Sequence, residues 1–169
     1  MSLLIPLKPN KKQMIIDLVS ECGIDVSHWS FKKNGEKVKY PQSNSRFCYE
    51  WAFGGRTEPY LFCIWYESLE CIDGAVCFCV NLRKKAIRHE AGSSPGDKQH
   101  AKKSRNFDRL LEDAFKTASP VRVVIVDNEH RPPKAHSKGS TVQYRMLDKA
   151  HWYVRNYDVN NGDVVLERS

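Results

Sequence analysis

The chain has 169 residues, of which 41% are hydrophobic and 28% charged, and its formal net charge is +7 at pH 7. This length is typical of a single domain, here residues 1–169, and the apolar share is large enough for a packed core. No apolar run approaches the ~20 residues of a membrane-spanning helix, and the first residues lack the pattern of a signal peptide, so we expect a cytoplasmic protein without membrane contact.

The first predicted element is an amphipathic helix over residues 11–22. Its apolar residues recur at helical spacing: Met14, Ile15, Leu18, Val19 and Cys22. Asn10 is expected to cap its start and Gly23 to end it. A turn then carries Trp29, and the lysine-rich stretch from 31 to 45 is expected to be a loop.

Three strands are predicted next, over residues 46–53, 60–66 and 75–81. They are rich in aromatic and β-branched residues and are separated by the turn dipeptides Gly54-Gly55 and Asp73-Gly74. Short connections of this kind favour an antiparallel meander.

A second helix is predicted over residues 97–118. One side is an apolar stripe: Phe107, Leu110, Leu111, Ala114, Phe115 and Ala118. The opposite side is a basic stripe with spacings of four, three, four and seven residues: Lys98, Lys102, Arg105, Arg109 and Lys116. We therefore expect one side to pack and the other to face solvent.

The last third of the sequence predicts a buried strand over residues 121–127, a basic proline-containing loop over 128–139, and a terminal hairpin of strands 152–157 and 163–168. Together the elements predict an α+β fold. Its sheet is expected to be curved and mainly antiparallel, with about five or six strands and two packed helices. A closed, barrel-like sheet is the alternative.

The positive charge is concentrated in the later part of the chain. Residues 81–156 contain 17 Lys and Arg against 8 Asp and Glu. A local excess of this kind attracts polyanions, and nucleic acid is the common intracellular one, although a basic surface can also serve solubility alone. The phosphate contacts expected are the run ending the third strand, the helix stripe and the loop: Arg83, Lys84, Lys85, Lys98, Lys102, Arg105, Arg109, Arg131, Lys134 and Lys138.

A base-contacting pocket is a further hypothesis, with Tyr49, Glu50, Trp51 and Trp65 as its candidates. If residues 46–53 form a strand, Glu50 alternates with Tyr49 and Trp51, and a carboxylate so placed must pair with a base or face a polar pocket. The alternative is that these aromatic side chains simply build the core.

The six cysteines contain no Cys-x-x-Cys pair, and most lie in apolar, strand-like runs. We expect reduced thiols that pack as small apolar groups and bind no metal. The sequence also lacks a glycine-rich phosphate loop and a Gly-x-Ser-x-Gly elbow. No convincing histidine or Asp/Glu-x-Lys nuclease arrangement occurs either. We therefore expect no catalytic centre and no cofactor.

Several blocks follow one another in a familiar order: residues 23–29, Cys48-Tyr-Glu-Trp-Ala-Phe53, residues 81–83 and 120–124, Leu147-Asp-Lys-Ala-His-Trp152, and the ending from 157 to 168. They resemble the N-terminal DNA-recognition domain of McrA-like HNH endonucleases, which are bacterial, modification-dependent (type IV) restriction enzymes. The resemblance extends from about residue 11 to 168.

This resemblance implies binding of double-stranded DNA, with sensing of a modified base as a further expectation. In that family a zinc-containing HNH nuclease module follows the domain, and residues 1–169 do not include it. Two other functions stay open: a non-catalytic protein-interaction or regulatory module that recruits a nuclease partner, and an RNA-binding domain, which would prefer single strands.

Overall fold

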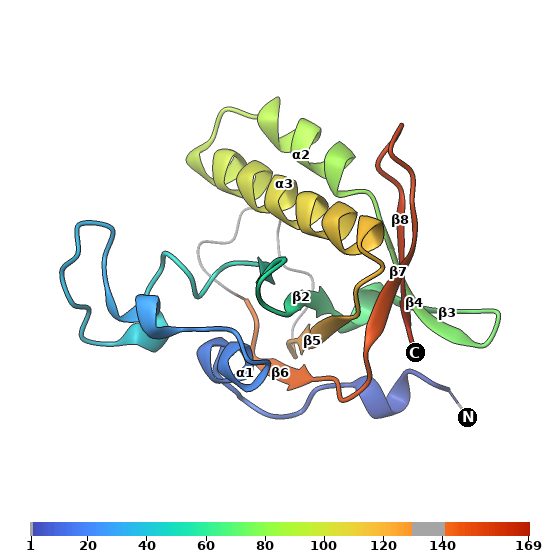
Figure 1. Ribbon diagram of the computed structural model, residues 1–169, viewed down its shortest axis with the longest axis horizontal. Coiled ribbons are helices and arrows are strands. Elements are labelled where there is room, and N and C mark those ends of the chain that lie inside the picture. Colours follow the sequence, from blue (N-terminus) through green and yellow to red (C-terminus); the bar gives the residue numbers. More distant parts are fainter. Residues whose placement is uncertain (1, 130–140) are drawn as a thin grey trace.

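The computed structural model describes residues 2–129 and 141–169. In these ranges it contains three α-helices and one eight-stranded sheet (Figure 1). The helices are α1 (Ile15–Glu21), α2 (Leu82–Glu90) and α3 (Pro95–Lys116). The strands are β1 (Ala52–Phe53), β2 (Tyr60–Trp65), β3 (Leu69–Ile72), β4 (Ala75–Val80), β5 (Val121–Asp127), β6 (Tyr144–Leu147), β7 (Trp152–Tyr157) and β8 (Val164–Arg168). Among the described helices, none is both long and apolar enough to cross a membrane.

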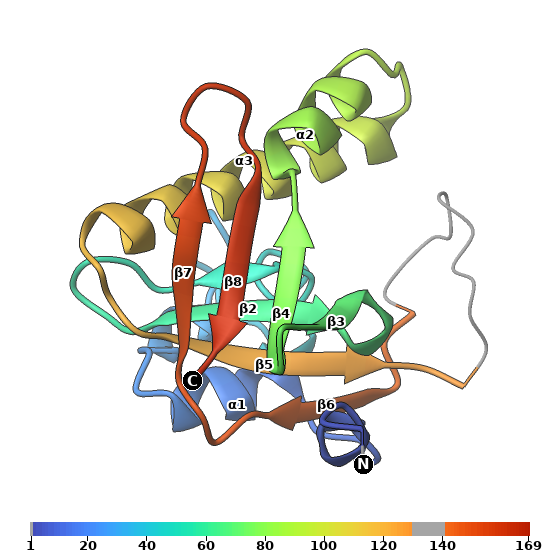
Figure 2. The same cartoon turned by 90° about the vertical axis from the view of Figure 1, so that its right-hand side faces the viewer.

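The strand order is β1-β2-β5-β7-β8-β4-β3, and β6 also pairs with β5. All pairs are antiparallel except β2 with β5. β5 meets β7 through one residue pair, Val121 with Trp152. The sheet bends at this junction, so β4, β7 and β8 run across the direction of β2, β5 and β6 (Figure 2). The predicted α+β fold with a curved, mainly antiparallel sheet is confirmed, but the sheet has more strands and is not closed.

The predicted meander is wrong. Residues 45–49 form turns, and only Ala52–Phe53 of the first predicted strand joins the sheet. β2 pairs with β1 and, in parallel, with β5, whereas β4 pairs with β3 and β8. Parallel pairing requires a long crossover connection, and local sequence patterns do not reveal which distant strand will be the neighbour.

The core has two parts because β2 and β5 are buried on both faces. On one face, α3 packs its apolar stripe onto the sheet, with the rings of Phe62 and Phe107 4.8 Å apart. On the other face, Leu18 and Val19 of α1 pack with Leu61 of β2. Side chains alternate along a strand, so neighbours Leu61 and Phe62 serve opposite halves of the core. Trp29 is fully buried on the α1 side.

A buried carboxylate holds the bend of the sheet. Asp148 accepts hydrogen bonds from Trp152 Nε1 at 2.8 Å and from Nε and Nη2 of Arg168 at 2.7 and 3.1 Å. Arg122 of β5 donates to the Asp148 carbonyl oxygen at 3.0 Å. The side chains therefore link β5, β7 and β8 where the backbone ladder is reduced to a single pair.

Two helix boundaries differ from the sequence prediction. α1 begins at Ile15 and has no side-chain cap, so Asn10 does not cap it. α3 begins at Pro95, because Ser94 and Asp97 form a capping box in which each side chain accepts from the other residue's backbone N–H. Beyond Lys116, Ala118 adopts a left-handed conformation, and the helix ends before Pro120.

The sequence prediction missed α2. Asn81 caps this helix, its side-chain oxygen accepting from the backbone N–H of Lys84 at 2.9 Å. Arg83, Lys84 and Lys85 therefore begin a helix and do not end a strand. In a helix, successive side chains point about 100° apart, so the three cations of this run have different surroundings.

Gly54 provides a test of the turn that places β1. Its φ is +84°, and a Cβ there would lie 1.8 Å from the carbonyl oxygen of Pro59. Gly35 has a similar φ of +86° but open space around it. We expect Gly54→Ala to destabilise the fold by about 3 kcal/mol or more, and Gly35→Ala by about 1–2 kcal/mol from backbone strain alone. Urea unfolding of both variants measures this, and equal losses would contradict the backbone clash.

Candidate nucleic-acid interface

α2 and α3 lie side by side as a helical hairpin on one side of the sheet (Figures 1 and 2). All seven described residues predicted to contact phosphate lie on this hairpin. The exposed basic side chains on it are Lys84, Arg88, Lys98, Lys102, Arg105, Arg109 and Lys116. The hairpin is therefore the candidate interface.

Not every cation of the hairpin is available. Arg105 forms a two-pronged ion pair with Glu90 of α2, at 2.8 and 2.9 Å. Arg109 donates to the side chain of Asn106 at 3.0 Å. Arg83 donates to the carbonyl oxygen of Val159 at 2.9 Å and to the Tyr157 hydroxyl at 3.3 Å. Arg83 thus anchors the β7–β8 turn. These hydrogen bonds occupy guanidinium N–H groups that the predicted phosphate contact would also use.

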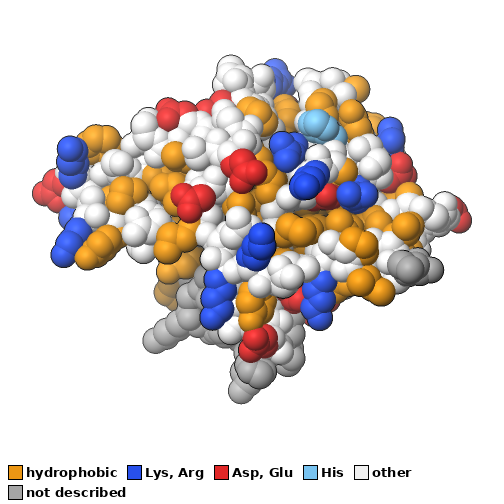
Figure 3. Space-filling view, turned by 90° about the horizontal axis from the view of Figure 1, so that it is seen from below, with side chains coloured by type: hydrophobic (Ala, Val, Ile, Leu, Met, Phe, Trp, Pro, Cys, Tyr) orange, Lys and Arg blue, Asp and Glu red, His pale blue; other side chains and the backbone are white. Residues whose placement is uncertain are grey.

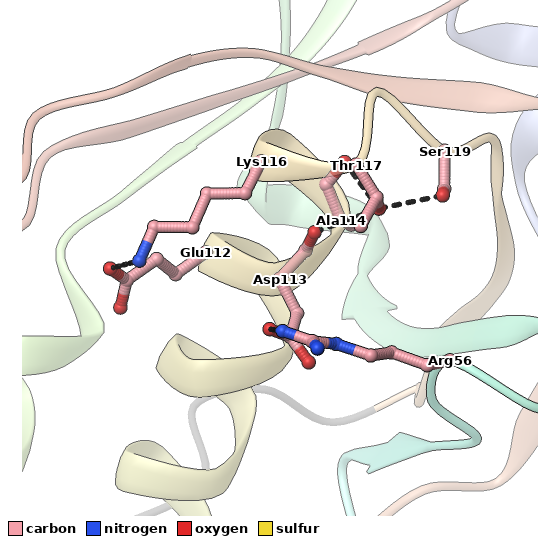
Figure 4. A network of polar contacts seen from close by, with 7 residues as sticks. All are labelled: Arg56, Glu112, Asp113, Ala114, Lys116, Thr117 and Ser119. Atoms are coloured by element: carbon pink, nitrogen blue, oxygen red, sulfur yellow. Dashed lines mark hydrogen bonds and ion pairs between the residues drawn. The ribbon is translucent and has the colours of Figure 1, made fainter.

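The C-terminal part of α3 is neutralised by its own neighbours (Figure 4). Asp113 pairs with Arg56 at 2.9 Å, and Lys116 pairs with Glu112 at 2.6 Å. Thr117 donates to the Asp113 carbonyl oxygen at 2.8 Å, closing the last turn. Of the seven exposed cations on the hairpin, four have neither an ion pair nor a side-chain hydrogen bond to another described residue: Lys84, Arg88, Lys98 and Lys102. Uncompensated positive charge thus lies on α2 and the N-terminal half of α3.

A second group of cations surrounds Trp51, and we call it the Trp51 cluster: Glu50, Trp51, Lys85, His89, His100 and Lys103. The ammonium nitrogens of Lys85 and Lys103 lie 4.8 and 5.6 Å from the centre of the Trp51 ring. The His100 ring stacks on the same indole at 5.6 Å and 24°. Loop, α2 and α3 therefore meet at this indole.

The cluster lies on a different side of α3 from the basic stripe. His100, Lys103 and Phe107 follow one another at spacings of three and four residues, so they share one side of α3, and Phe107 packs on the sheet. Lys98, Lys102 and Arg109 lie on the opposite side of the helix, in solvent. One helix thus carries an outer basic surface and an inner, half-buried basic cluster.

Burial and mutual repulsion disfavour the charges of the cluster. Burial lowers the pKa of Lys85, and Arg88 lowers it further. Burial lowers the pKa of Lys103, although Glu50 opposes this shift. The pKa of His100 is lowered by burial and then by His89, Lys103 and Lys85. A cation–π contact contributes about 0.5–2 kcal/mol, whereas desolvating an ion costs several kcal/mol, so the indole alone does not offset these charges.

Acidic groups compensate the cluster only in part. Asp97 is hydrogen-bonded to His89 Nδ1 at 3.0 Å and to Ser94 Oγ at 2.7 Å, which hold the pKa of Asp97 at about 2. Burial raises the pKa of Glu50, an effect that Lys103 and Lys102 reduce. Asp97 is thus engaged in the helix cap, and Glu50 is the carboxylate that acts on Lys103.

The four pocket candidates from the sequence do not form one pocket. Tyr49 is 42% exposed, with the Lys103 ammonium 5.8 Å from its ring centre. The Trp51 ring is covered by Lys85, Lys103 and His100. Trp65 packs on the α1 side of the sheet, whereas Trp51 packs on the α3 side. The strand alternation assumed for Glu50 does not exist, because residues 45–49 form turns.

Lys103, His89 and His100 are site residues that the sequence patterns did not indicate. Lys103 is one position away from the basic stripe and so was not assigned to it. The two histidines become neighbours, with ring centres 5.0 Å apart, only because α2 folds back on α3. The cap at Asn81 was the available signal for α2. Arg131, Lys134 and Lys138 lie outside the described residues.

The face below the sheet has a different character. There, acidic and basic side chains are interspersed among hydrophobic ones (Figure 3). A hollow of about 460 Å³ lies between the N-terminal segment, α1 and β6, and both Arg145 and Glu21 line it. This mixture does not produce the single-sign field that attracts a polyanion.

The cysteines are less buried than the sequence suggested. Cys22 and Cys77 are buried, but Cys71 and Cys79 are exposed, and all six are free thiols in the structure. No group of three or more His, Cys, Asp and Glu side chains suited to a metal ion occurs within the described ranges.

Comparison with family models, curated proteins and solved structures produced no match to this chain.

His100 gives the fold a testable pH dependence. Its folded-state pKa is depressed, so the stability it confers is fully present above the unfolded value of about 6.5 and is lost as pH falls through the folded pKa. We expect His100→Asn to lose less free energy of unfolding than wild type between pH 7 and pH 5. Chemical denaturation across this range measures the difference, with His151→Asn as control at an exposed histidine. Identical pH profiles for His100→Asn and wild type would contradict the burial effect.

Proposed function

We propose that this chain binds double-stranded DNA, as a recognition domain of the kind found in modification-dependent restriction systems. The observation that carries the proposal is the set of uncompensated cations on the outer side of the α2–α3 hairpin: Lys84, Arg88, Lys98 and Lys102. Lys and Arg on one surface neutralise phosphates and release counterions, which supplies affinity that does not depend on sequence.

The link to modified DNA is supported by the motif resemblance and by one polar feature. Glu50 is half-buried beside the exposed Tyr49 ring, within electrostatic reach of Lys102 and Lys103. A carboxylate can accept a hydrogen bond from the amino group of cytosine. The Tyr49 side chain is exposed, whereas cations cover the Trp51 ring. Tyr49 is therefore the better of these two candidates for contact with a base.

Salt dependence tests the DNA-binding function. Neutralising about four to six phosphates corresponds to a slope of about −4 to −5 when log affinity is plotted against log salt concentration. Fluorescence anisotropy with one duplex over a range of KCl concentrations measures it. A slope near zero, or no binding at low salt, would instead favour the protein-interaction module. Tighter binding to single-stranded RNA would favour the RNA-binding alternative.

The outer surface has its own test. Lys98→Ala with Lys102→Ala should flatten the slope by about 2 and weaken binding of every duplex sequence alike, since phosphate contacts carry no sequence information. The control is Lys33→Ala with Lys37→Ala, which removes the same charge from the exposed loop after Phe31. If both double variants weaken binding equally, general charge is responsible and the hairpin is not the contact surface.

Glu50→Gln separates base contact from structure. If Glu50 contacts a base, we expect the preference between unmodified and modified duplexes to shrink at least about fivefold, corresponding to a lost hydrogen bond of about 1 kcal/mol, while the salt slope stays the same. Matched duplexes carrying cytosine, 5-methylcytosine, 5-hydroxymethylcytosine or a phosphorothioate linkage provide the comparison. An unchanged preference in a variant that unfolds like wild type would exclude the base contact.

A further inference from the structure

Three nitrogen-bearing side chains converge on one aromatic ring in the Trp51 cluster. Lys85 comes from α2, His100 and Lys103 come from α3, and all three lie within 6 Å of the indole centre. The indole is itself fixed, since Trp51 packs against the α3-side core and its carbonyl oxygen accepts from the backbone N–H of Cys63 at 2.8 Å. Donors from two helices therefore lie against the same fixed indole ring.

The described carboxylates balance this positive charge only in part. Within the described residues, Lys85 forms no ion pair, and the charged neighbour that perturbs it is another cation, Arg88. His89 is already bonded to Asp97, and Glu50 raises the pKa of Lys103. This placement is unfavourable for the charges, because burial lowers the pKa of Lys85, Lys103 and His100, and His89 and the two lysines lower that of His100 further.

The donor set fits a phosphate group. Ammonium groups bind phosphate as point charges, and a histidine ring nitrogen can donate a further hydrogen bond. A phosphate offers at least two anionic or acceptor oxygens in different directions, which matches donors that arrive from two helices. A chloride ion has no such directional acceptors.

We propose that Lys85, Lys103 and His100, arranged around Trp51, form a binding site for one phosphate group. The site lies on the inner side of α3, away from the outer basic surface that supports the proposed function. It can therefore exist whether or not the outer surface binds DNA. Trp51 acts as a positioning residue that holds the donors, and it is not a stacking platform for a base.

The test uses the full chain and inorganic phosphate, monitored by NMR of the tryptophan indole N–H and histidine ring signals. We expect saturable shifts of Trp51 and His100 with half-saturation on the order of 1 mM phosphate. KCl at matched ionic strength should not reproduce them. Equal shifts with chloride, or shifts that map away from Trp51 and His100, would overturn the proposal without any variant.

Variants then identify the donors. Lys85→Met and Lys103→Met keep the aliphatic length, and each should weaken phosphate binding at least about tenfold, as expected for loss of a charge-assisted hydrogen bond. Lys33→Met, at an exposed lysine outside the hairpin, should leave the phosphate affinity unchanged. Thermal unfolding shows which variants retain the fold. If folded Lys85→Met and Lys103→Met both bind phosphate like wild type, the assignment is wrong.

Two competitors identify the source of the phosphate. A blunt DNA duplex that abolishes the phosphate-dependent shifts would show that the site takes a phosphate of the DNA backbone. Adenosine monophosphate that saturates the site while the duplex does not would show that it takes a small phosphorylated molecule. If neither the duplex nor adenosine monophosphate displaces inorganic phosphate, the site does not bind the phosphate group of a larger molecule, and the proposal is overturned in that form. Loss of duplex binding with the phosphate shifts intact would reject the proposed DNA function and leave this site standing.

Discussion

Six consecutive residue pairs, from Tyr60–Val121 to Trp65–Val126, join β2 to β5 in parallel, and side chains of both strands are buried on both faces of the sheet. A parallel pair cannot be closed by a tight turn, so the chain between these strands must cross over one face. That crossover contains the β3–β4 hairpin and the α2–α3 hairpin. The position of every candidate cation on α2 and α3 depends on this one pairing.

The two halves of the crossover helix α3 have different surroundings. In its C-terminal half, α3 packs Phe107, Leu111 and Ala114 on the sheet, and its charges pair with Arg56 or with each other. In its N-terminal half, the same inward side meets α2 and the Trp51 loop. Polar and basic side chains occupy the inward side of this half of α3, because its partners are α2 and the loop that carries Trp51, and no longer the apolar sheet. This change of partner produces a half-buried basic cluster without disrupting the core.

Trp51 shows how a conspicuous aromatic residue can have a role other than base stacking. Its ring is covered by two ammonium groups and a stacked imidazole, which leaves little indole surface for a ligand. The indole offers the cations an attractive face, and this contact is weaker than the hydration they lose. Trp51 thus positions Lys85, Lys103 and His100. The kind of ligand expected there depends on these basic groups and not on the indole.

The amino-acid sequence alone predicts the fold class, the amphipathic α3, the buried β5 and the terminal β7–β8 hairpin. These follow from local signals: helical periodicity, β-branched runs, and the Asn160-Asn161-Gly162 turn. It also located the excess positive charge, since charge can be counted without a structure. Three features become visible only in the folded chain: β2 pairs with β5, Arg83 anchors a turn, and Trp51 and Trp65 lie on opposite faces of the sheet. Only the packed structure brings Lys85, His100 and Lys103 together, because they come from two helices whose contact depends on burial and a crossover, and no periodicity within either segment encodes it.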